Sequence, residues 1–193
     1  MKKYFHNAFE KSIKAKRQCI DLGFTNLEKI GEGICQSIKS KGKLLLCGNG
    51  GSAADAQHLA AELIVRLRSE IDRKPIPALT LAMDSSTMTA CGNDYSYEQV
   101  FERSLLALGK ENDCLLAIST SGNSRNIILA MKAAKKLGIK VYALLGKDGG
   151  ECLRYCDCAY IVPNDNTAAI QECHIVAGHA LMEMVEDSVL NEN

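Results

Sequence analysis

Two stretches of the chain carry side chains whose types and spacing suit acid–base chemistry or metal binding. In the first, His58 and Glu62 are four residues apart, so they share one face of a helix. In the second, Gln171 and His179 are eight residues apart, which is about two turns along one face. An imidazole and a carboxylate on one helix, with an amide and an imidazole on another, can converge on a divalent metal or on a substrate.

Ordinary structural roles also fit both pairs. A histidine and a glutamate at this spacing often form a surface ion pair that contributes about 0.3–0.5 kcal/mol. A single histidine on an apolar helix face is commonly a core residue that hydrogen-bonds its neighbours. The spacing alone therefore leaves metal binding, acid–base catalysis and a structural role open.

Two loops rich in small residues suit phosphate binding. Each follows a short apolar run and precedes a helical pattern: Cys47–Ser52 reads CGNGGS, and Ser119–Ser124 reads STSGNS. Small residues let the backbone N–H groups at a helix start approach an anion. The second loop adds hydroxyl donors that suit a phosphate monoester. Either loop alone would also suit an ordinary turn, but the hydroxyl groups lead us to predict phosphate binding at the second.

The kind of phosphate compound follows from motifs that the chain lacks. Neither loop has the G-x-G-x-x-G spacing of a dinucleotide site, and G-x-x-x-x-G-K-[ST] is absent from the sequence. We therefore expect a phosphorylated sugar in preference to a nucleotide.

Short apolar runs alternate with helical patterns after about residue 41, which predicts a parallel sheet with helices on both faces. In such folds ligands bind beyond the carboxyl ends of the strands, where both loops would lie. Residues 1–41 show a helical pattern twice. The expected strands are Lys43–Cys47, Ala78–Leu81, Cys114–Ser119, Lys140–Leu145 and Ala159–Val162. The expected helices are Ser52–Leu67, Tyr97–Leu108, Asn123–Leu137 and Thr167–Leu190.

Composition narrows the functional classes. The chain of 193 residues has a formal net charge of zero, so it offers no basic surface for nucleic acid. No apolar run approaches the ~20 residues that span a membrane, and the N-terminus lacks the apolar core of a secretory signal. We therefore expect a cytoplasmic protein.

The nine cysteines read as small buried residues without disulfides, as expected in a reducing compartment. Cys152, Cys156 and Cys158 offer an alternative metal site, but their spacing is unusual for structural zinc.

The chain resembles the phosphoheptose isomerases of the sugar-isomerase (SIS) superfamily over nearly its whole length. The long GNGGSAADAQH run followed by STSGNS and IQE-x-H is far more specific than an isolated glycine motif. The matching segments are CGNGGSAADAQHLAAEL (47–63), CGNDYSYEQVF (91–101), STSGNS (119–124), GKDGG (146–150) and IQECHIVAGH (170–179).

The resemblance implies a fold, an assembly and a reaction. The fold is a single SIS domain over 1–193, with 1–41 as a helical extension. It is a three-layer α/β sandwich around a mostly parallel five-stranded sheet, similar to flavodoxin, with N-terminal helices. The assembly is a cytoplasmic homotetramer with active sites between subunits. The reaction converts sedoheptulose 7-phosphate, a phosphorylated seven-carbon sugar, to D-glycero-D-manno-heptose 7-phosphate through an enediol(ate). It is the first step towards activated heptose for lipopolysaccharide core or surface glycans.

The resemblance also assigns roles to individual residues. Glu62 and His179 correspond to the family's acid–base pair. The zinc ligands, for one Zn²⁺ per subunit, correspond to His58, Glu62, Gln171 and His179. Substrate contacts correspond to Asn49, Gly50, Gly51, Glu62, Asn93, Asp94, Ser119, Thr120, Ser121, Ser124 and Gln171.

Three alternative functions stay open at this stage. One is a non-catalytic SIS tetramer that binds a replication-initiator protein, but such proteins lack the Glu62 and His179 equivalents that are present here. Another is a sugar-phosphate sensor, although no DNA-binding module is attached. The third is an isomerase of another phosphosugar, because Ala169 stands where the family commonly has an arginine in T-x-R-I-Q-E.

Overall fold

Five parallel strands form the central sheet of the protein, in the order β2-β1-β3-β4-β5. The computed structural model describes residues 2–81 and 84–191. This sheet, with helices on both faces, confirms the predicted three-layer α/β fold. The strands are β1 (Leu44–Gly48), β2 (Ala78–Thr80), β3 (Cys114–Ser119), β4 (Lys140–Gly146) and β5 (Cys158–Val162).

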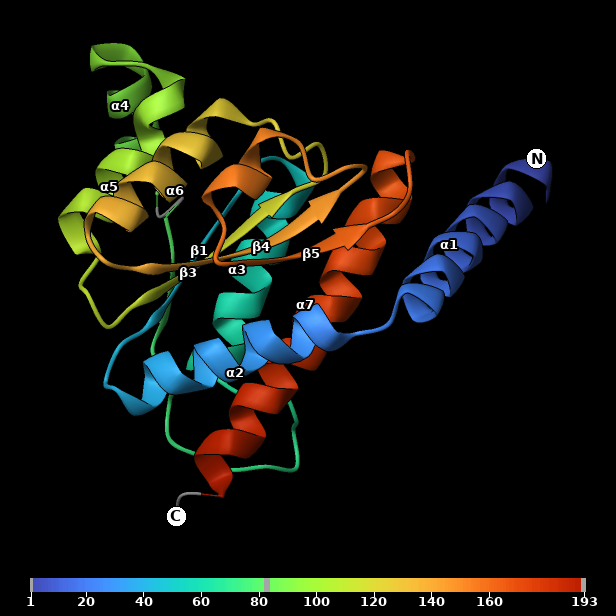
Figure 1. The fold of residues 1–193 in the computed structure, drawn as a ribbon, viewed down its shortest axis with the longest axis horizontal. Coiled ribbons are helices and arrows are strands. Elements are labelled where there is room, and N and C mark those ends of the chain that lie inside the picture. Colours follow the sequence, from blue (N-terminus) through green and yellow to red (C-terminus); the bar gives the residue numbers. More distant parts are fainter. Residues whose placement is uncertain (1, 82–83, 192–193) are drawn as a thin grey trace.

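The helices cover the sheet on two sides, with α4, α5 and α6 on one face and α2, α3 and α7 on the other (Figure 1). The helices are α1 (Lys2–Leu22), α2 (Thr25–Lys39), α3 (Gly51–Ile64), α4 (Ser85–Asp94), α5 (Val100–Leu108), α6 (Arg125–Lys136) and α7 (Thr167–Leu190). Two short 3-10 turns are η1 (Tyr97–Gln99) and η2 (Glu151–Tyr155).

The central strands are apolar on both faces, because each face packs against its own helical layer. Leu44 and Leu46 of β1 face the layer that contains α2, α3 and α7. Leu45 and Cys47 of the same strand face the layer that contains α5 and α6. Such strands appear in the sequence as continuous apolar runs, which is why all five were predictable.

The order of the strands positions the two small-residue loops. From β1 the chain continues into α3 on one face of the sheet, and from β3 it continues into α6 on the other face. Because β1 and β3 are adjacent and parallel, their loops leave the same edge and diverge there. Ligands bind at such a switch point in open α/β sheets.

Helix α3 ends at Ile64, three residues before the predicted end at Leu67. In a longer helix the N–H of Leu67 would bind the carbonyl of Leu63, but both groups bind other partners. The N–H of Ile76 donates to the carbonyl of Leu63 at 3.0 Å, and the N–H of Leu67 donates to Glu186 at 3.4 Å. These tertiary hydrogen bonds replace the continuation of the helix.

Helix α1 lies beside α7 and β5 and extends away from the sheet (Figure 1). It exposes apolar side chains that a single copy of the chain leaves uncovered, including Tyr4, Phe5, Phe9 and Ile13. Within residues 2–81 and 84–191, no helix is long and apolar enough to cross a membrane. All nine cysteines are free thiols, and all are buried as predicted except Cys156 and Cys158, which are half-buried.

A buried histidine joins α7 to the end of β4. His174 is fully buried, and its Nε2 lies 2.9 Å from the carbonyl oxygen of Leu145, so Nε2 carries the proton that it donates. Its Nδ1 has no hydrogen-bond partner among the described residues. Burial lowers the pKa of His174 from its ordinary 6.5 to about 4, and the bond to Leu145 opposes this only in part.

The histidine makes stability depend on pH. Because the native pKa is lowered, the unfolded chain binds the extra proton first, so stability is lost as pH falls from about 6.5 to about 4. We expect this residue to lower the free energy of unfolding by about 3 kcal/mol across that window. Denaturant unfolding of the wild type and His174→Gln, in chelator, should show a flatter dependence for the variant. Parallel curves would contradict this account.

Candidate active site

Helices α3 and α7 pack closely, and this packing brings the predicted acid–base residues together. An added Cβ at Gly178 of α7 would lie 2.5 Å from Cδ1 of Leu59 on α3, so the glycine lets the Leu59 side chain pack directly against α7. His58 precedes Leu59, and His179 follows Gly178. The two imidazoles therefore lie next to this contact between the helices.

The two histidines and a glutamate form a compact cluster. Nε2 of His58 lies 2.8 Å from Nε2 of His179, and the rings meet edge to face. Nε2 of His58 also lies 3.3 Å from Oε1 of Glu62. Each of these ring nitrogens can donate a proton, accept one or bind a metal, according to the tautomer of its imidazole, and a carboxylate lies beside the pair.

The cluster also has the donor atoms that a metal needs. One ligand atom from each of His58, Glu62 and His179 lies within 4.8 Å of the other two. Two imidazole nitrogens and one carboxylate oxygen make a common donor set for zinc. The residues present therefore fit a divalent metal.

Gln171 is held beside this cluster by a buried carboxylate. Its Nε2 lies 2.6 Å and 2.8 Å from the two carboxylate oxygens of Asp55, which is 6% exposed. Burial raises the pKa of Asp55, while the Gln171 bond and the two nearby histidines oppose the shift. Because Nε2 faces Asp55, the carbonyl oxygen Oε1 is the atom that Gln171 can offer to a ligand.

The loop Ser119–Ser124, here called the hydroxyl loop, runs from the last residue of β3 to the start of α6. Oγ of Ser119 lies 3.4 Å from Oγ of Ser124 and accepts the N–H of Gly122 at 3.1 Å. Ser124 stands at the N-cap of α6, but its side chain makes no capping hydrogen bond. Since the first N–H groups of a helix lack helical partners, this loop has the donors and the dipole that an anion requires.

The glycine-rich loop after β1 is tied to its surroundings through Asn49. Asn49 and Asn126 of α6 exchange two side-chain hydrogen bonds, at 2.9 Å and 2.8 Å. The hydroxyl of Tyr97 in η1 also donates to Oδ1 of Asn49 at 2.8 Å. Asn49 thus links the glycine-rich loop to α6 and η1, and its predicted contact with substrate stays a prediction.

The hydroxyl loop and the acid–base helices meet at Gly146, the last residue of β4. An added Cβ there would lie 2.5 Å from the carbonyl oxygen of Thr120 and 2.7 Å from Cγ2 of Ile170. Ile170 directly precedes Gln171. Gln171 in turn lies over Gly51, where an added Cβ would be 3.5 Å from its Cδ.

The structure thus groups most of the predicted residues at one edge of the sheet. The other two, Asn93 and Asp94, lie at the exposed end of α4 and hydrogen-bond each other at 2.8 Å. No described hydrogen bond joins these two to the other predicted site residues.

Sequence reasoning missed several polar residues at the site. They are Asp55, Arg73, Tyr97, Asn126 and Glu186, which bind predicted site residues or the helices that carry them. Asp55 and Tyr97 lie inside segments that carried the family resemblance, which is the one signal that pointed to them.

Comparison with known proteins identifies the family of the chain. The SIS domain family model matches residues 8–146. A phosphoheptose isomerase of Clostridium acetobutylicum is 47% identical over 194 residues, covering 100% of this chain and 98% of its own length.

Two solved structures match nearly the whole chain. The phosphoheptose isomerase of Neisseria gonorrhoeae superposes with a TM-score of 0.90 at 39% identity, covering 96% of this chain and 98% of that one. The phosphoheptose isomerase of Francisella tularensis gives a TM-score of 0.91 at 37% identity, with 96% and 97% covered.

The conformation of the hydroxyl loop gives a test. Gly122 has a φ of 66°, and an added Cβ would lie 2.1 Å from the carbonyl oxygen of Gly149. Gly23 also has a positive φ, 81°, but nothing lies within 4 Å of its Cβ position. We expect Gly23→Ala to cost about 1–2 kcal/mol of stability through backbone strain. Gly122→Ala should cost about 1–3 kcal/mol more because the loop must also move.

The free energy of unfolding in denaturant measures both variants, and the Michaelis constant for a phosphosugar substrate should rise only for Gly122→Ala. Equal destabilisation of the two variants would show that the contact between the loops does not constrain Gly122.

Proposed function

The chain belongs to the phosphoheptose isomerase family of SIS-domain proteins, and on that basis we propose that it interconverts sedoheptulose 7-phosphate and D-glycero-D-manno-heptose 7-phosphate. It is therefore an enzyme of the aldose–ketose isomerase class. One observation carries the proposal: the His58–Glu62–His179 cluster lies on helices beside the loops that suit a sugar phosphate.

The phosphate group binds at the hydroxyl loop in this proposal. The first N–H groups of α6 and the hydroxyls of that loop supply neutral donors, and the helix dipole favours the negative charge. This anchors one end of the sugar. Its carbonyl end then extends towards α3 and α7. The hydroxyl donors belong to Ser119, Thr120, Ser121 and Ser124.

The acid–base pair moves the proton. The reaction transfers a proton between C1 and C2 of the sugar, while the carbonyl and hydroxyl groups exchange places. Glu62 takes the carbon-bound proton, and His179 exchanges a proton with the neighbouring oxygen or carbon. His58 lies against the imidazole of His179, with the two Nε2 atoms 2.8 Å apart. A positioned acid or base of this kind contributes about 10²–10⁴-fold in rate.

A divalent metal completes the proposed site. His58, Glu62 and His179 would hold it, and Gln171 would add its carbonyl oxygen. Zinc is our proposed ion, because two imidazoles, a carboxylate and an amide oxygen suit it. When bound, it would supply Lewis-acid stabilisation of negative charge on the sugar oxygens.

The alternatives differ in how much support they have. A purely partner-binding role is disfavoured because Glu62 and His179 are both present and close to His58. The main competing proposal is an isomerase of another phosphosugar, because Ala169 stands where the family commonly has an arginine. Ala169 is 3% exposed and packs in the core at the start of α7, so it offers no charge to a substrate.

The assembly and the location of the enzyme are also proposals. The exposed apolar side chains of α1 support a homotetramer in which these residues become buried between subunits, with active sites at those contacts. The cytoplasmic location expected from the sequence stays a prediction, and so do the substrate contacts of Asn93 and Asp94.

Replacement of Glu62 tests the proposed base. Glu62→Gln keeps the shape and removes the basic oxygen, so we expect the turnover number with sedoheptulose 7-phosphate to fall by about 10²–10⁴-fold. Formation of the aldose measures the rate, with folding checked by thermal unfolding. Most of the activity surviving in the variant would assign the base to another group.

Removal of metal is a separate test. Treatment of the wild type with a strong chelator should abolish turnover, and added zinc should restore it. Full activity in the chelator would refute the proposed metal. A wild type that is folded and zinc-loaded, yet inactive on this substrate, would direct attention to other phosphosugars.

A further inference from the structure

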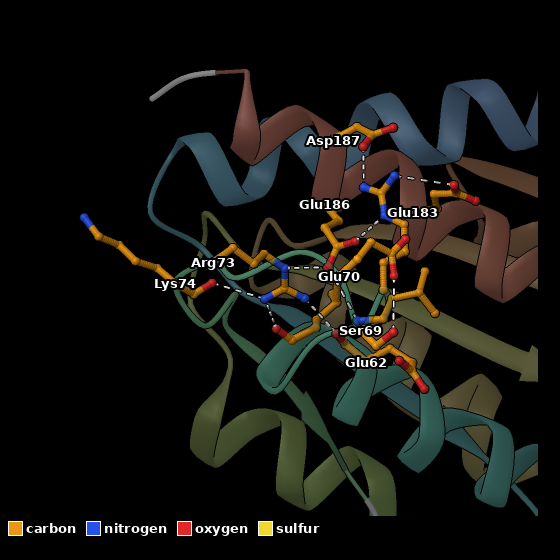
Figure 2. A network of polar contacts seen from close by, with 11 residues as sticks. Glu62, Ser69, Glu70, Arg73, Lys74, Glu183, Glu186 and Asp187 are labelled. Atoms are coloured by element: carbon orange, nitrogen blue, oxygen red, sulfur yellow. Dashed lines mark hydrogen bonds and ion pairs between the residues drawn. The ribbon is translucent and has the colours of Figure 1, made fainter.

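A fully buried carboxylate on α7, outside the histidine cluster, faces the segment that follows α3. Glu186 of α7 has 0% exposed side chain and binds two arginines from the segment after α3 (Figure 2). Nε of Arg68 lies 2.7 Å from its Oε2, and Nε of Arg73 lies 2.7 Å from its Oε1. Arg73 is itself 2% exposed.

Only one of these arginines also binds α3. Nη2 of Arg73 donates to the carbonyl oxygen of Glu62 at 2.8 Å, and Nη1 donates to the carbonyl oxygen of Leu63 at 2.8 Å. These carbonyls belong to the last turn of α3, where helical partners are missing. The guanidinium therefore caps the helix, and its positive charge also suits the negative end of the helix dipole.

Among the described residues, the side chain of Arg68 binds α7 alone. Besides Glu186, it pairs with Glu183 at 3.5 Å and with Asp187. All three partners lie within one turn of the same helix. Arg68 and Arg73 thus share Glu186, but only Arg73 continues to the backbone of Glu62.

The two arginines keep Glu186 ionised in spite of its burial. Burial by itself would raise the pKa of this carboxyl, but the hydrogen bonds from Arg68 and Arg73 outweigh it and hold the pKa below its usual range. A buried ion pair is weak evidence for stability, since desolvation offsets much of the attraction. Its defined geometry is the more informative property.

That geometry connects the two proposed acid–base residues. Glu186 follows His179 by seven residues, which is about two turns along one face of α7. Through Arg73 it holds the backbone of Glu62 itself, so one planar guanidinium spans from the helix of His179 to the carbonyl of Glu62.

We propose that Arg73 is a positioning residue: it fixes the end of α3 against α7 through Glu186 and so sets the placement of Glu62 relative to His179. This inference rests on the proposed roles of Glu62 and His179. Arg73 touches neither substrate nor metal and acts through the backbone that it holds. Its five N–H groups in a rigid fork explain why a lysine is no substitute.

Arg73→Lys tests the inference, with Arg68→Lys as the matched control. Both variants keep a positive charge beside Glu186, but Arg73→Lys loses the fork that reaches two carbonyls. We expect Arg73→Lys to lower the turnover number on sedoheptulose 7-phosphate at least tenfold, with a change of the Michaelis constant below about threefold. Its zinc affinity, measured by competition with a chromogenic chelator, should weaken by about 10–100-fold.

Arg68→Lys should stay within about twofold of the wild type in turnover number and in zinc affinity. Thermal unfolding is measured for both, so that kinetics are compared well below either melting temperature. If the two variants lose stability alike but keep wild-type turnover and zinc affinity, Arg73 is merely structural and the inference is overturned.

A second variant covers the case in which Arg73→Lys does not fold. The pair Arg73→Met with Glu186→Gln removes both charges, leaving no unpaired ion in the core. We expect the same loss of turnover and zinc affinity, and wild-type values would again overturn the inference.

Zinc affinity also separates this inference from the proposed function. If the wild type binds zinc but does not act on sedoheptulose 7-phosphate, the substrate assignment fails. A selective loss of zinc affinity in Arg73→Lys would still support the positioning role in that case.

Discussion

The close packing of α3 on α7 is the constraint on which the rest of the site depends. Gly178 favours it, because the absence of a side chain leaves room for Leu59 against α7. Three polar links then cross the same helix pair on either side of this apolar contact. They are Asp55 with Gln171, His58 with His179, and Glu62 with Glu186 through Arg73. Each link requires partners at a fixed separation, so a change in helix packing would alter all three together.

The second constraint is the common direction of the strands in the parallel sheet. Because β1, β3 and β4 run the same way, the loops that follow them leave one edge and can contact one another. Glycines permit this contact, since Gly122 and Gly150 come so close that a side chain at either would collide with the opposite loop. The two loops that we propose to bind phosphate therefore share one frame with α3 and α7, in which the proposed substrate would be held at both ends.

The fold was largely predictable because its strands are buried on both faces. Cys114–Ser119 and Thr167–Leu190 match the observed β3 and α7 in full. Helix α4 was missed because it buries only Cys91 and so has no apolar stripe. The end of α3 was placed too late because hydrogen bonds from distant residues, and no local signal, terminate the helix.

The candidate site was also predictable only in part from the sequence. The spacing of His58 and Glu62 placed both on one helix face, since that relation depends only on the geometry of a single helix. The hydroxyl loop and the family resemblance were likewise evident from the sequence. Only the tertiary structure decided that His58 meets His179, and that Arg73 binds a carboxylate 113 residues away. Charged residues such as Arg73 usually lie in solvent, so burial and partner choice come from the packing of distant elements.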